Sequence, residues 1–325
     1  MKIVAIGGGT GLSTLLRGLK EKVGNQIFKL SAIVTVADSG GSTGRLRKAY
    51  TMPAPGDIRN CIAALSESEE IIKALFQYRF SKGECDGHAF GNLLLVALTD
   101  ITGSFLQGVS IASQILRTKG EIIPSTAENV ELWARFEDGK EIMGEEEITK
   151  YGKESLSKIE RVWIEPKEAR APDEAIQRLS EADMIVFGPG SLYTSVLPNL
   201  LVEDIKKTIQ ESNALKVFVV NAMTQPGETT GYTAFDHLER FLTISGLSQV
   251  NAVIVNTRMP SDRILRNYLE NSQEPVIPDV SKIARAGVKV YTGDLIGEKE
   301  DFVRHDPQRL AELLLSLLPV HESLS

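Results

Sequence analysis

The sequence is poor in the residues that build extracellular, metal-binding or membrane proteins. Its 325 residues include only two cysteines, Cys61 and Cys85, too few for a disulfide framework and in no metal-binding cluster. The four histidines are scattered, so no zinc site is predicted. No apolar run approaches the ~18 residues that a membrane span requires. We therefore expect a cytoplasmic protein with reduced thiols and no membrane-spanning segment.

The chain also lacks an excess of positive charge. Its formal net charge is −7, which argues against general binding of nucleic acids through their phosphates. A hydrophobic content of 42% and a charged content of 24% are typical of a globular chain. Its length allows one large domain or two modest ones, burying roughly 75% of the unfolded surface. Because a strand pattern begins at residue 2, we expect no signal peptide.

Glycine, by contrast, is concentrated after apolar segments. Residues 2–6 read Lys-Ile-Val-Ala-Ile, a run typical of a buried strand in a parallel sheet. Residues 7–11 read Gly-Gly-Gly-Thr-Gly, and an amphipathic helix is predicted over 12–19. A strand, a glycine loop and a helix N-terminus aim unpaired backbone N–H groups at one point, which favours a phosphate. The other interpretation is a tight turn without a ligand.

The familiar glycine motifs for nucleotides are incomplete here. The dinucleotide fingerprint G-x-G-x-x-G would need a glycine where Leu12 or Thr14 stands. No Gly-Lys-Ser/Thr follows the glycines, which excludes a P-loop. The loop therefore predicts an anion-binding site but does not identify the ligand.

A second strand is predicted over residues 28–36, and Asp38 follows at its tip. Doubly wound folds place the acidic residue that binds a ribose hydroxyl at this position. The alternative is an aspartate that caps the turn. The loop after it is rich in glycine and hydroxyl groups and contains Arg45 and Arg47. We expect one of these arginines to pair with phosphate oxygens and the other to be solvated.

Two further segments combine polar groups at the start of a predicted helix. Residues 53–60 read Pro-Ala-Pro-Gly-Asp-Ile-Arg-Asn, in which Asp57 fits either an N-cap or a metal-binding or catalytic carboxylate. Arg59 and Asn60 share its helical turn. Farther on, His88 and Asn92 lie one turn apart and offer an imidazole and an amide to one ligand. His88 is a candidate general acid or base, with a helix-start residue as the alternative.

The pattern changes between residues 122 and 165. Residues 130–136 alternate with period two, 137–140 predict a hairpin turn, and 161–165 alternate again. The acids at 145–147 are interpreted as part of a solvated charge run. We expect an antiparallel arm whose apolar residues pack on the parent domain or contribute to a dimer contact.

The α/β pattern then resumes, and two more strands end in polar loops. The strand at 183–187 opens into a second glycine loop at 188–191, and the strand at 217–220 opens into a loop rich in Asn, Thr and Gln. Two anion-ready loops at strand carboxyl ends predict a ligand crevice at a topological switch point. Near the end of the chain, Tyr268 is a candidate for base stacking, and Arg304, in a predicted loop, is a candidate for binding a diphosphate.

Six motifs, read together along residues 1 to about 310, resemble the bacterial YvcK proteins. They are residues 6–11 (IGGGTG), 36–47 (VADSGGSTGRLR), 55–60 (PGDIRN), 87–92 (GHAFGN), 188–195 (GPGSLYTS) and 221–229 (NAMTQPGET). YvcK proteins are called gluconeogenesis factors, are linked to growth on gluconeogenic carbon sources and to cell shape, and are similar to the 2-phospho-L-lactate transferase CofD. The resemblance implies a Rossmann-like fold, a cytoplasmic location and a nucleotide-diphosphate ligand, a UDP-sugar such as UDP-N-acetylglucosamine.

The resemblance to CofD also implies a possible chemistry. CofD moves a phospholactyl group from a guanosine diphosphate ester to a deazaflavin alcohol, with a magnesium ion. CofD-type enzymes carry Gly-Asp-Asp after the second strand, whereas this chain has Ala37-Asp38-Ser39. Since metal-bridged phosphates need carboxylate ligands, Asp57 is the candidate that would replace the second carboxylate.

We therefore predict a Rossmann-like α/β fold, a mostly parallel sheet with helices on both faces and a small antiparallel β insertion. The nucleotide-binding core is assigned to residues 1–121 and 166–325, and the insertion to 122–165. The candidate catalytic residues are Asp57 and His88, and the candidate Mg²⁺ ligands are Asp38 and Asp57. The candidate nucleotide- and phosphate-binding residues are Gly8, Gly9, Thr10, Gly11, Asp38, Ser39, Gly40, Gly41, Ser42, Arg45, Arg59, Asn60, Asn92, Gly188, Pro189, Gly190, Ser191, Thr194, Ser195, Asn221, Thr224, Gln225, Tyr268 and Arg304.

Three functions are compatible with these residues. The first is a UDP-sugar-binding regulator of carbon metabolism and cell shape. The second is a CofD-like, Mg²⁺-dependent transferase acting on a nucleotide diphosphate ester. The third is an NAD(P)-binding oxidoreductase, which Asp38 favours but the incomplete fingerprint does not. A homo-oligomer and regulatory protein partners in metabolism or wall synthesis are also expected.

Overall fold

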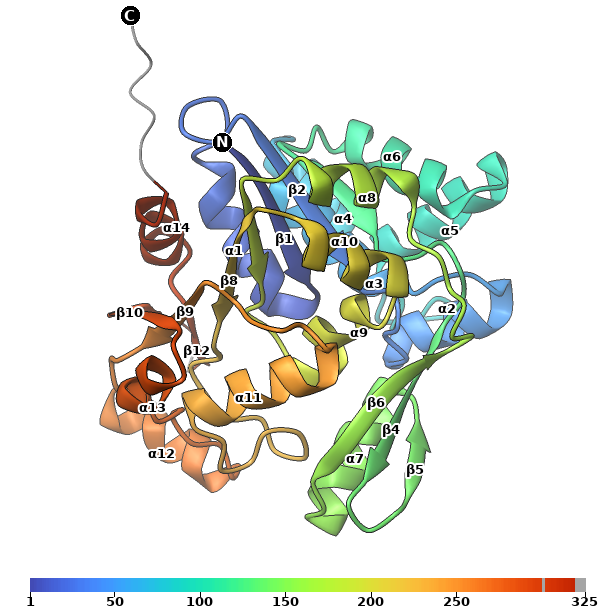
Figure 1. Cartoon of the computed structure of the whole chain (residues 1–325). Coiled ribbons are helices and arrows are strands. Elements are labelled where there is room, and N and C mark those ends of the chain that lie inside the picture. Colours follow the sequence, from blue (N-terminus) through green and yellow to red (C-terminus); the bar gives the residue numbers. More distant parts are fainter. Residues whose placement is uncertain (300–301, 319–325) are drawn as a thin grey trace, which may run out of the picture.

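A seven-stranded parallel sheet forms the centre of the computed structural model, which describes residues 1–299 and 302–318 (Figure 1). In order across the sheet, the strands are β10 (Lys289–Gly293), β9 (Ala252–Asn256), β8 (Leu215–Val219), β7 (Met184–Phe187), β1 (Lys2–Gly7), β2 (Lys29–Val34) and β3 (Glu121–Pro124). All neighbouring pairs are parallel. The predicted α/β fold with a parallel sheet is therefore confirmed.

The direction in which strands are added reverses between β1 and β7. From β1 the chain builds outward to β2 and β3, then returns to the other side of β1 and adds β7, β8, β9 and β10. In open α/β sheets, ligands bind outside the carboxyl ends of the strands at such a reversal. The two glycine loops, which leave β1 and β7, therefore stand on either side of the topological switch point.

Helices cover both faces of the sheet because its strands are apolar on both faces. Four residues of β1, from Ile3 to Ile6, are at most 2% exposed. In Figure 1, α8 (Asp173–Ser180) and α10 (Glu203–Glu211) lie over one face, and α1 (Gly9–Lys20) and α3 (Gly56–Leu65) lie over the other. The other helices are α2 (Gly41–Tyr50), α4 (Glu70–Gln77), α5 (Phe90–Thr102), α6 (Phe105–Ile115), α9 (Leu197–Leu200), α11 (Ala234–Ser245), α12 (Asp262–Glu270), α13 (Val280–Arg285) and α14 (Pro307–Ser316), with a π-helical turn η1 (Leu192–Val196) before α9.

An antiparallel arm projects from the body of the molecule (Figure 1). It consists of β4 (Glu131–Phe136), β5 (Glu141–Met143), the helix α7 (Glu145–Ser155) and β6 (Ile159–Glu165), with strand order β5-β4-β6. The predicted hairpin turn joins β4 to β5, and Gly139 adopts a φ of +85° there. Of the described helices, none is long and apolar enough to cross a bilayer.

Three local predictions are corrected by the structure. Residues 122–124, which the prediction placed in the arm, pair with β2 in the parallel sheet. The acids at 145–147 open the helix α7, where negative charge favours a helix N-terminus and the buried Ile148 anchors the helix to the arm. Arg304 lies on a strand, β12 (Phe302–His305), which pairs with β11 (Ile296–Lys299).

Candidate functional site

The two glycine loops contact each other at the switch point. A Cβ atom on Gly11 would clash with the Pro189 carbonyl oxygen and lie 2.6 Å from its carbon and 2.9 Å from the Gly190 Cα. Likewise, a Cβ on Gly190 would lie 3.4 Å from the Gly8 carbonyl oxygen. The predicted convergence of the two loops is confirmed, and the glycines are needed because the backbones touch.

The first loop is shorter than predicted, because α1 already begins at Gly9 with Gly8 as its N-cap. The backbone N–H of Gly9 is bound to the carboxylate of Asp57. The amides of Thr10 and Gly11, in the first turn, have no intrahelical acceptor. Both residues line the cavity described below, so their amides are the N–H groups that an anion can reach.

The second loop is held in place by side-chain amides. The Gly190 N–H donates to Asn221 Oδ1 over 3.0 Å, so this amide is occupied and Asn221 positions the loop. Next to it, Ser191 Oγ donates to Gln225 Oε1 over 2.6 Å. Pro189 is buried, and Thr194 and Ser195 lie in the buried π-helical turn that follows. The segment at 188–195 is therefore a rigid wall of the crevice.

A buried amide ties both loops together, and its removal gives a first prediction. Asn199 Nδ2 donates to the Gly7 carbonyl over 3.2 Å and to the Ser195 carbonyl over 2.9 Å. Asn199→Ala should lower the free energy of unfolding by about 2–3 kcal/mol, because three buried hydrogen bonds of its amide are lost, although the Gly7 carbonyl keeps the Thr35 N–H. Urea unfolding measures this, with Gln210→Ala as control, since the exposed Gln210 amide bonds only to the Gly246 carbonyl. Equal, small losses in both variants would contradict the role given to Asn199.

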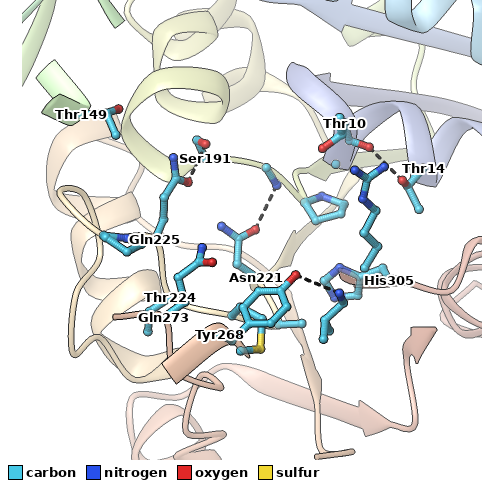
Figure 2. Close-up of a pocket in the computed structure, with 18 of the residues that line it drawn as sticks. Thr10, Thr14, Thr149, Ser191, Asn221, Thr224, Gln225, Tyr268, Gln273 and His305 are labelled. Atoms are coloured by element: carbon cyan, nitrogen blue, oxygen red, sulfur yellow. Dashed lines mark hydrogen bonds between the residues drawn. The ribbon is translucent and has the colours of Figure 1, made fainter. Parts of the chain in front are cut away.

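A cavity of about 390 Å³ opens between the two loops, the segment that follows β8, and β12 (Figure 2). Its lining consists of Thr10, Gly11, Thr14, Thr149, Lys153, Pro189, Gly190, Ser191, Asn221, Ala222, Met223, Thr224, Gln225, Pro226, Tyr268, Gln273, Val303, Arg304 and His305. The lining contains the cations of Lys153 and Arg304 and no carboxylate. Together with the free amides of α1, this favours an anionic ligand.

One wall of this first cavity is suited to a flat ring. The Tyr268 hydroxyl accepts the Val303 N–H over 2.8 Å, which fixes the phenol at the wall (Figure 2). Thr224 Oγ1 accepts the Glu274 N–H over 2.9 Å. His305 is buried beside them, and burial lowers its pKa to about 4, so the imidazole is neutral. Its buried Nε2 has no hydrogen-bond partner among the described residues.

A second cavity of about 510 Å³ continues the first along α7. Both cavities are lined by Thr149 and Lys153, and the second also by Asp38, Gly40, Glu145, Glu146 and Lys150. Asp38 Oδ1 accepts the Gly40 N–H over 2.8 Å, so it does cap the turn. Its Oδ2 lies 2.6 Å from the position a Cβ would take on Gly56, at the start of α3. The two cavities together form one crevice with a cationic and an acidic end.

Carboxyl groups gather at and behind the acidic end, where Asp38 and Glu145 line the second cavity, while Asp57 and Glu228 line neither cavity. Burial, and secondarily the charge of Asp38, raise the pKa of Asp57 to about 7, although the Gly9 amide and Asn60 stabilise its charged form. Burial and Asp38 likewise raise the pKa of Glu145 well above its usual range. Burial raises the pKa of Glu228 to about 7, and this carboxyl accepts hydroxyl groups from Thr149 over 3.1 Å and Thr194 over 3.2 Å. Strongly raised pKa values in a crevice are typical of functional sites.

The predicted alternatives for Asp57 can now be separated. The N-cap of α3 is Pro55, and no side chain caps this helix, so Asp57 is not an N-cap. Its carboxylate instead reaches back to Gly8 and Gly9, at the start of α1. The charge of Asp38 contributes to the raised pKa of Asp57, so the two carboxylates lie within electrostatic reach of each other.

The residues present fit a magnesium ion only in part. In residues 1–299 and 302–318, no group of three or more His, Cys, Asp or Glu side chains is placed to hold a metal. Mg²⁺, however, usually takes one or two carboxylates and completes its shell with phosphate oxygens and water. Asp38 and Asp57 are two carboxylates of this kind, but only Asp38 lines a cavity.

The other predicted residues form a separate polar cluster beside the crevice. Ser42 Oγ lies 3.0 Å from His88 Nδ1 and accepts from Asn92 Nδ2 over 3.3 Å. Burial and Arg45 lower the pKa of His88, whereas Arg45 itself donates to the Asp86 carbonyl. None of these four residues lines either cavity of the crevice. The motif at 87–92 therefore supports the first turn of α2 from outside the crevice.

The remaining arginines and loop residues have mixed positions. Arg47 is buried and structural, bonding to Asn129, Val130 and Glu131. Arg59 lies within electrostatic reach of Asp57 and Asp38, and its buried Nε has no partner among the described residues. Ser39 donates to Glu147, and Gly41 begins α2.

The helix α7 contributes residues to the crevice that were not predicted from the sequence. Glu145, Thr149 and Lys153 reach the crevice because the arm folds back over it. A local signal existed, since Ile148 and Gly152 fall four residues apart on one buried face. Gly152 packs directly on the backbone of Gly227, which leaves no room for a side chain. Helical spacing within the charge run would have predicted this helix.

Comparisons with known proteins agree with the fold and the motifs. The chain is 63% identical to the "Putative gluconeogenesis factor" of Aquifex aeolicus, over 98% of this chain and 97% of that protein. It is 44% identical to the gluconeogenesis factor of Bacillus subtilis, over 98% of both. A crystal structure of a Bacillus halodurans protein superposes with a TM-score of 0.91 at 44% identity, covering 96% of this chain and 99% of that one. The family model described as 2-phospho-L-lactate transferase CofD matches residues 3–296, and the chain therefore belongs to the CofD family.

Proposed function

We propose that this protein binds a nucleoside diphosphate ester, a UDP-sugar, in the crevice at the switch point. The observation that carries the proposal is the first cavity, whose lining combines Lys153 and Arg304 with Thr10 and Gly11 at the N-terminus of α1 and includes no carboxylate. Two cations and a helix N-terminus match the charge of a diphosphate. A volume of about 390 Å³ accommodates a nucleoside and its phosphates.

The crevice has two ends, and they suggest an orientation for the ligand. The base would stack on Tyr268 and exchange hydrogen bonds with Gln273 and Thr224. The diphosphate would lie against α1, and the sugar would extend toward the second cavity. In this orientation Asp38, predicted to bind a ribose hydroxyl, contacts the sugar end.

A regulatory role follows from the relatives. Proteins similar over nearly the whole chain are named gluconeogenesis factors. A cytoplasmic protein that senses a nucleotide sugar would couple carbon flux to wall synthesis and cell shape through the occupancy of one site. Binding without turnover is sufficient for this role, and protein partners in metabolism or wall synthesis would read the bound state.

A CofD-like transferase is the second candidate, favoured by the pair of Asp38 and Asp57. Mg²⁺ held by these carboxylates and by phosphate oxygens would neutralise the phosphate charge. Asp57, with a pKa raised by burial to about 7, can accept a proton from an incoming hydroxyl group near neutral pH. Against this candidate, the second adjacent carboxylate of CofD-type enzymes is Ser39 in this chain.

Calorimetry with UDP-N-acetylglucosamine, GDP and NAD, each with and without Mg²⁺, separates the candidates. Tight binding of the UDP-sugar without turnover of the labelled ester supports the regulator. Mg²⁺-dependent release of UMP or GMP from a labelled ester supports the transferase. Preferred binding of NAD would support the oxidoreductase alternative and contradict both.

A substitution in the second cavity tests the site. Asp38→Ala should weaken the preferred nucleotide at least tenfold, about 1.4 kcal/mol, because a ligand hydroxyl or bound cation loses its carboxylate. Asp100→Ala, an exposed acid on α5, is the matched control and should leave affinity unchanged. If calorimetry gave an unchanged affinity for Asp38→Ala, the role of Asp38 would be limited to capping the turn through its hydrogen bond with Gly40.

A further inference from the structure

The outward face of the arm carries both tryptophans of the chain. In the register of the sheet, Trp133 on β4 lies between Trp163 on β6 and Met143 on β5. The two indoles stack with centroids 6.0 Å apart and planes inclined by 14°. Both tryptophans are partly exposed, and Met143 is 48% exposed. An apolar row of this size in the middle of a sheet face is unusual for a free surface.

The opposite face of the same strands accounts for the packing of the arm. Leu132, Ala134 and Phe136 alternate with the outward residues and are fully buried. Phe136 meets Tyr151 of α7 edge to face, with centroids 4.8 Å apart. One face of the sheet therefore forms the hydrophobic core of the arm. The row of Trp133, Trp163 and Met143 on the other face does not contribute to that core.

Charged residues flank the tryptophans in two rows of opposite sign. On one side Arg135 pairs in register with Arg161 on β6 and with Glu141 on β5, and on the other Glu131 pairs with Glu165. Like charges directly opposite each other on adjacent strands are unfavourable within one sheet. Arg135 and Glu131 each have a close ion pair within the chain, with Glu160 and with Arg47, both over 3.1 Å. The ion pairs of Arg161 with Glu141 and of Lys167 with Glu165 are looser, at 3.9 and 3.7 Å, which leaves Arg161 and Glu165 available for a partner. We call these four residues and the apolar row the tryptophan face.

This charge pattern is complementary to itself. Consider two arms stacked face to face, with a two-fold axis between them that runs parallel to the apolar row. Each strand then lies over the same strand of the other copy, which runs in the opposite direction. The arginine row of one copy then lies over the glutamate row of the other, with Arg161 opposite Glu165, and the tryptophans pack at the centre. An aromatic centre with a charged rim is the usual anatomy of an interface, and a two-fold contact requires such self-complementarity.

We propose that the tryptophan face binds the same face of a second copy of this chain. The contact joins two arms back to back and leaves both crevices free on the other side of α7. Because α7 forms part of both the arm and the crevice, a dimer would hold the walls that Thr149 and Lys153 provide. This inference does not depend on which nucleotide the crevice binds.

Sedimentation equilibrium of the full chain tests the proposal. We expect wild type to sediment at twice the 35.6 kDa of one chain and to dissociate on dilution. Intrinsic fluorescence should shift to longer wavelength over the same dilution, since Trp133 and Trp163 are the two tryptophans of the chain. A monomer at all concentrations, or a dimer whose fluorescence is unchanged on dissociation, would overturn the proposal.

Charge reversal supplies the specific test. Arg161→Glu and Glu165→Arg should each weaken dimerisation at least tenfold, because like charges then meet across the axis. The double variant Arg161→Glu/Glu165→Arg restores the complementary pattern and should recover the dimer. Lys207→Glu, an equal charge change on an exposed position of α10, is the control and should leave the dimer intact. Circular dichroism checks that each variant folds. Dimers unaffected by either single reversal, or a double variant weaker than both, would contradict the interface.

Discussion

Replacing Gly11 by alanine should destabilise the protein by about 2–3 kcal/mol and reduce nucleotide diphosphate affinity more than a hundredfold. The added Cβ would meet the backbone of Pro189 and Gly190, which cannot move aside as a flexible side chain would. Separating the loops by the width of a methyl group shifts the first turn of α1 away from the opposite wall. Urea unfolding measures the first effect, and calorimetry with UDP-N-acetylglucosamine measures the second.

Gly297→Ala is the matched control for this prediction. A Cβ on Gly297 would lie 3.8 Å from Asp306 Oδ2, an ordinary van der Waals contact. The control should change neither stability nor affinity by a measurable amount. If Gly11→Ala unfolded like wild type and still bound the ligand, the close contact of the two loops would be irrelevant to the site.

Asp57→Asn should be more stable than wild type at pH 8 by about 2 kcal/mol, and equally stable near pH 4. The folded-state pKa of Asp57 is raised to about 7 from an ordinary value of 3.8, so the folded protein binds this proton more tightly than the unfolded chain does. Wild type therefore loses stability as pH rises from about 4 to about 7. The full shift would correspond to about 4 kcal/mol, which we halve because Asp57 is only partly buried as a residue.

The asparagine keeps an acceptor for the Gly9 amide and removes only the titration. Urea unfolding of both proteins at pH 4, 6 and 8 gives the difference directly. Glu228, whose pKa burial also raises to about 7, titrates in both proteins and cancels from the difference. A stability difference that does not depend on pH would mean that Asp57 is an ordinary ionised carboxylate.

Much of the fold could be predicted because its information is local. The apolar run at 2–6 has no polar face, so it had to be an inner strand of a parallel sheet. The glycines at 7–11 and 188–191 follow such strands directly, and parallel strands end at the same edge. Convergence of these loops, and of Asn221 and Thr224 with them, follows from strand periodicity alone.

The rest of the site depends on contacts between distant segments. The acids at 145–147 have the composition of a solvated run, and only the return of the arm over the crevice buries Glu145. The predicted helical face shared by His88 and Asn92 is wrong, because α5 begins only at Phe90 and His88 precedes it. Both side chains nevertheless meet at Ser42, a contact that spacing along the chain does not determine. Arg47 lies two positions after Arg45 on α2, so its side chain points toward the arm. There it bonds to Val130 and Glu131 and stabilises the fold.

A crystal structure of the chain with UDP-N-acetylglucosamine is the most direct test of the central claim. We expect the two phosphates to lie within hydrogen-bonding distance of the Thr10 and Gly11 amides, between Lys153 and Arg304. A nucleotide whose phosphates lie away from the junction of the two glycine loops would contradict it.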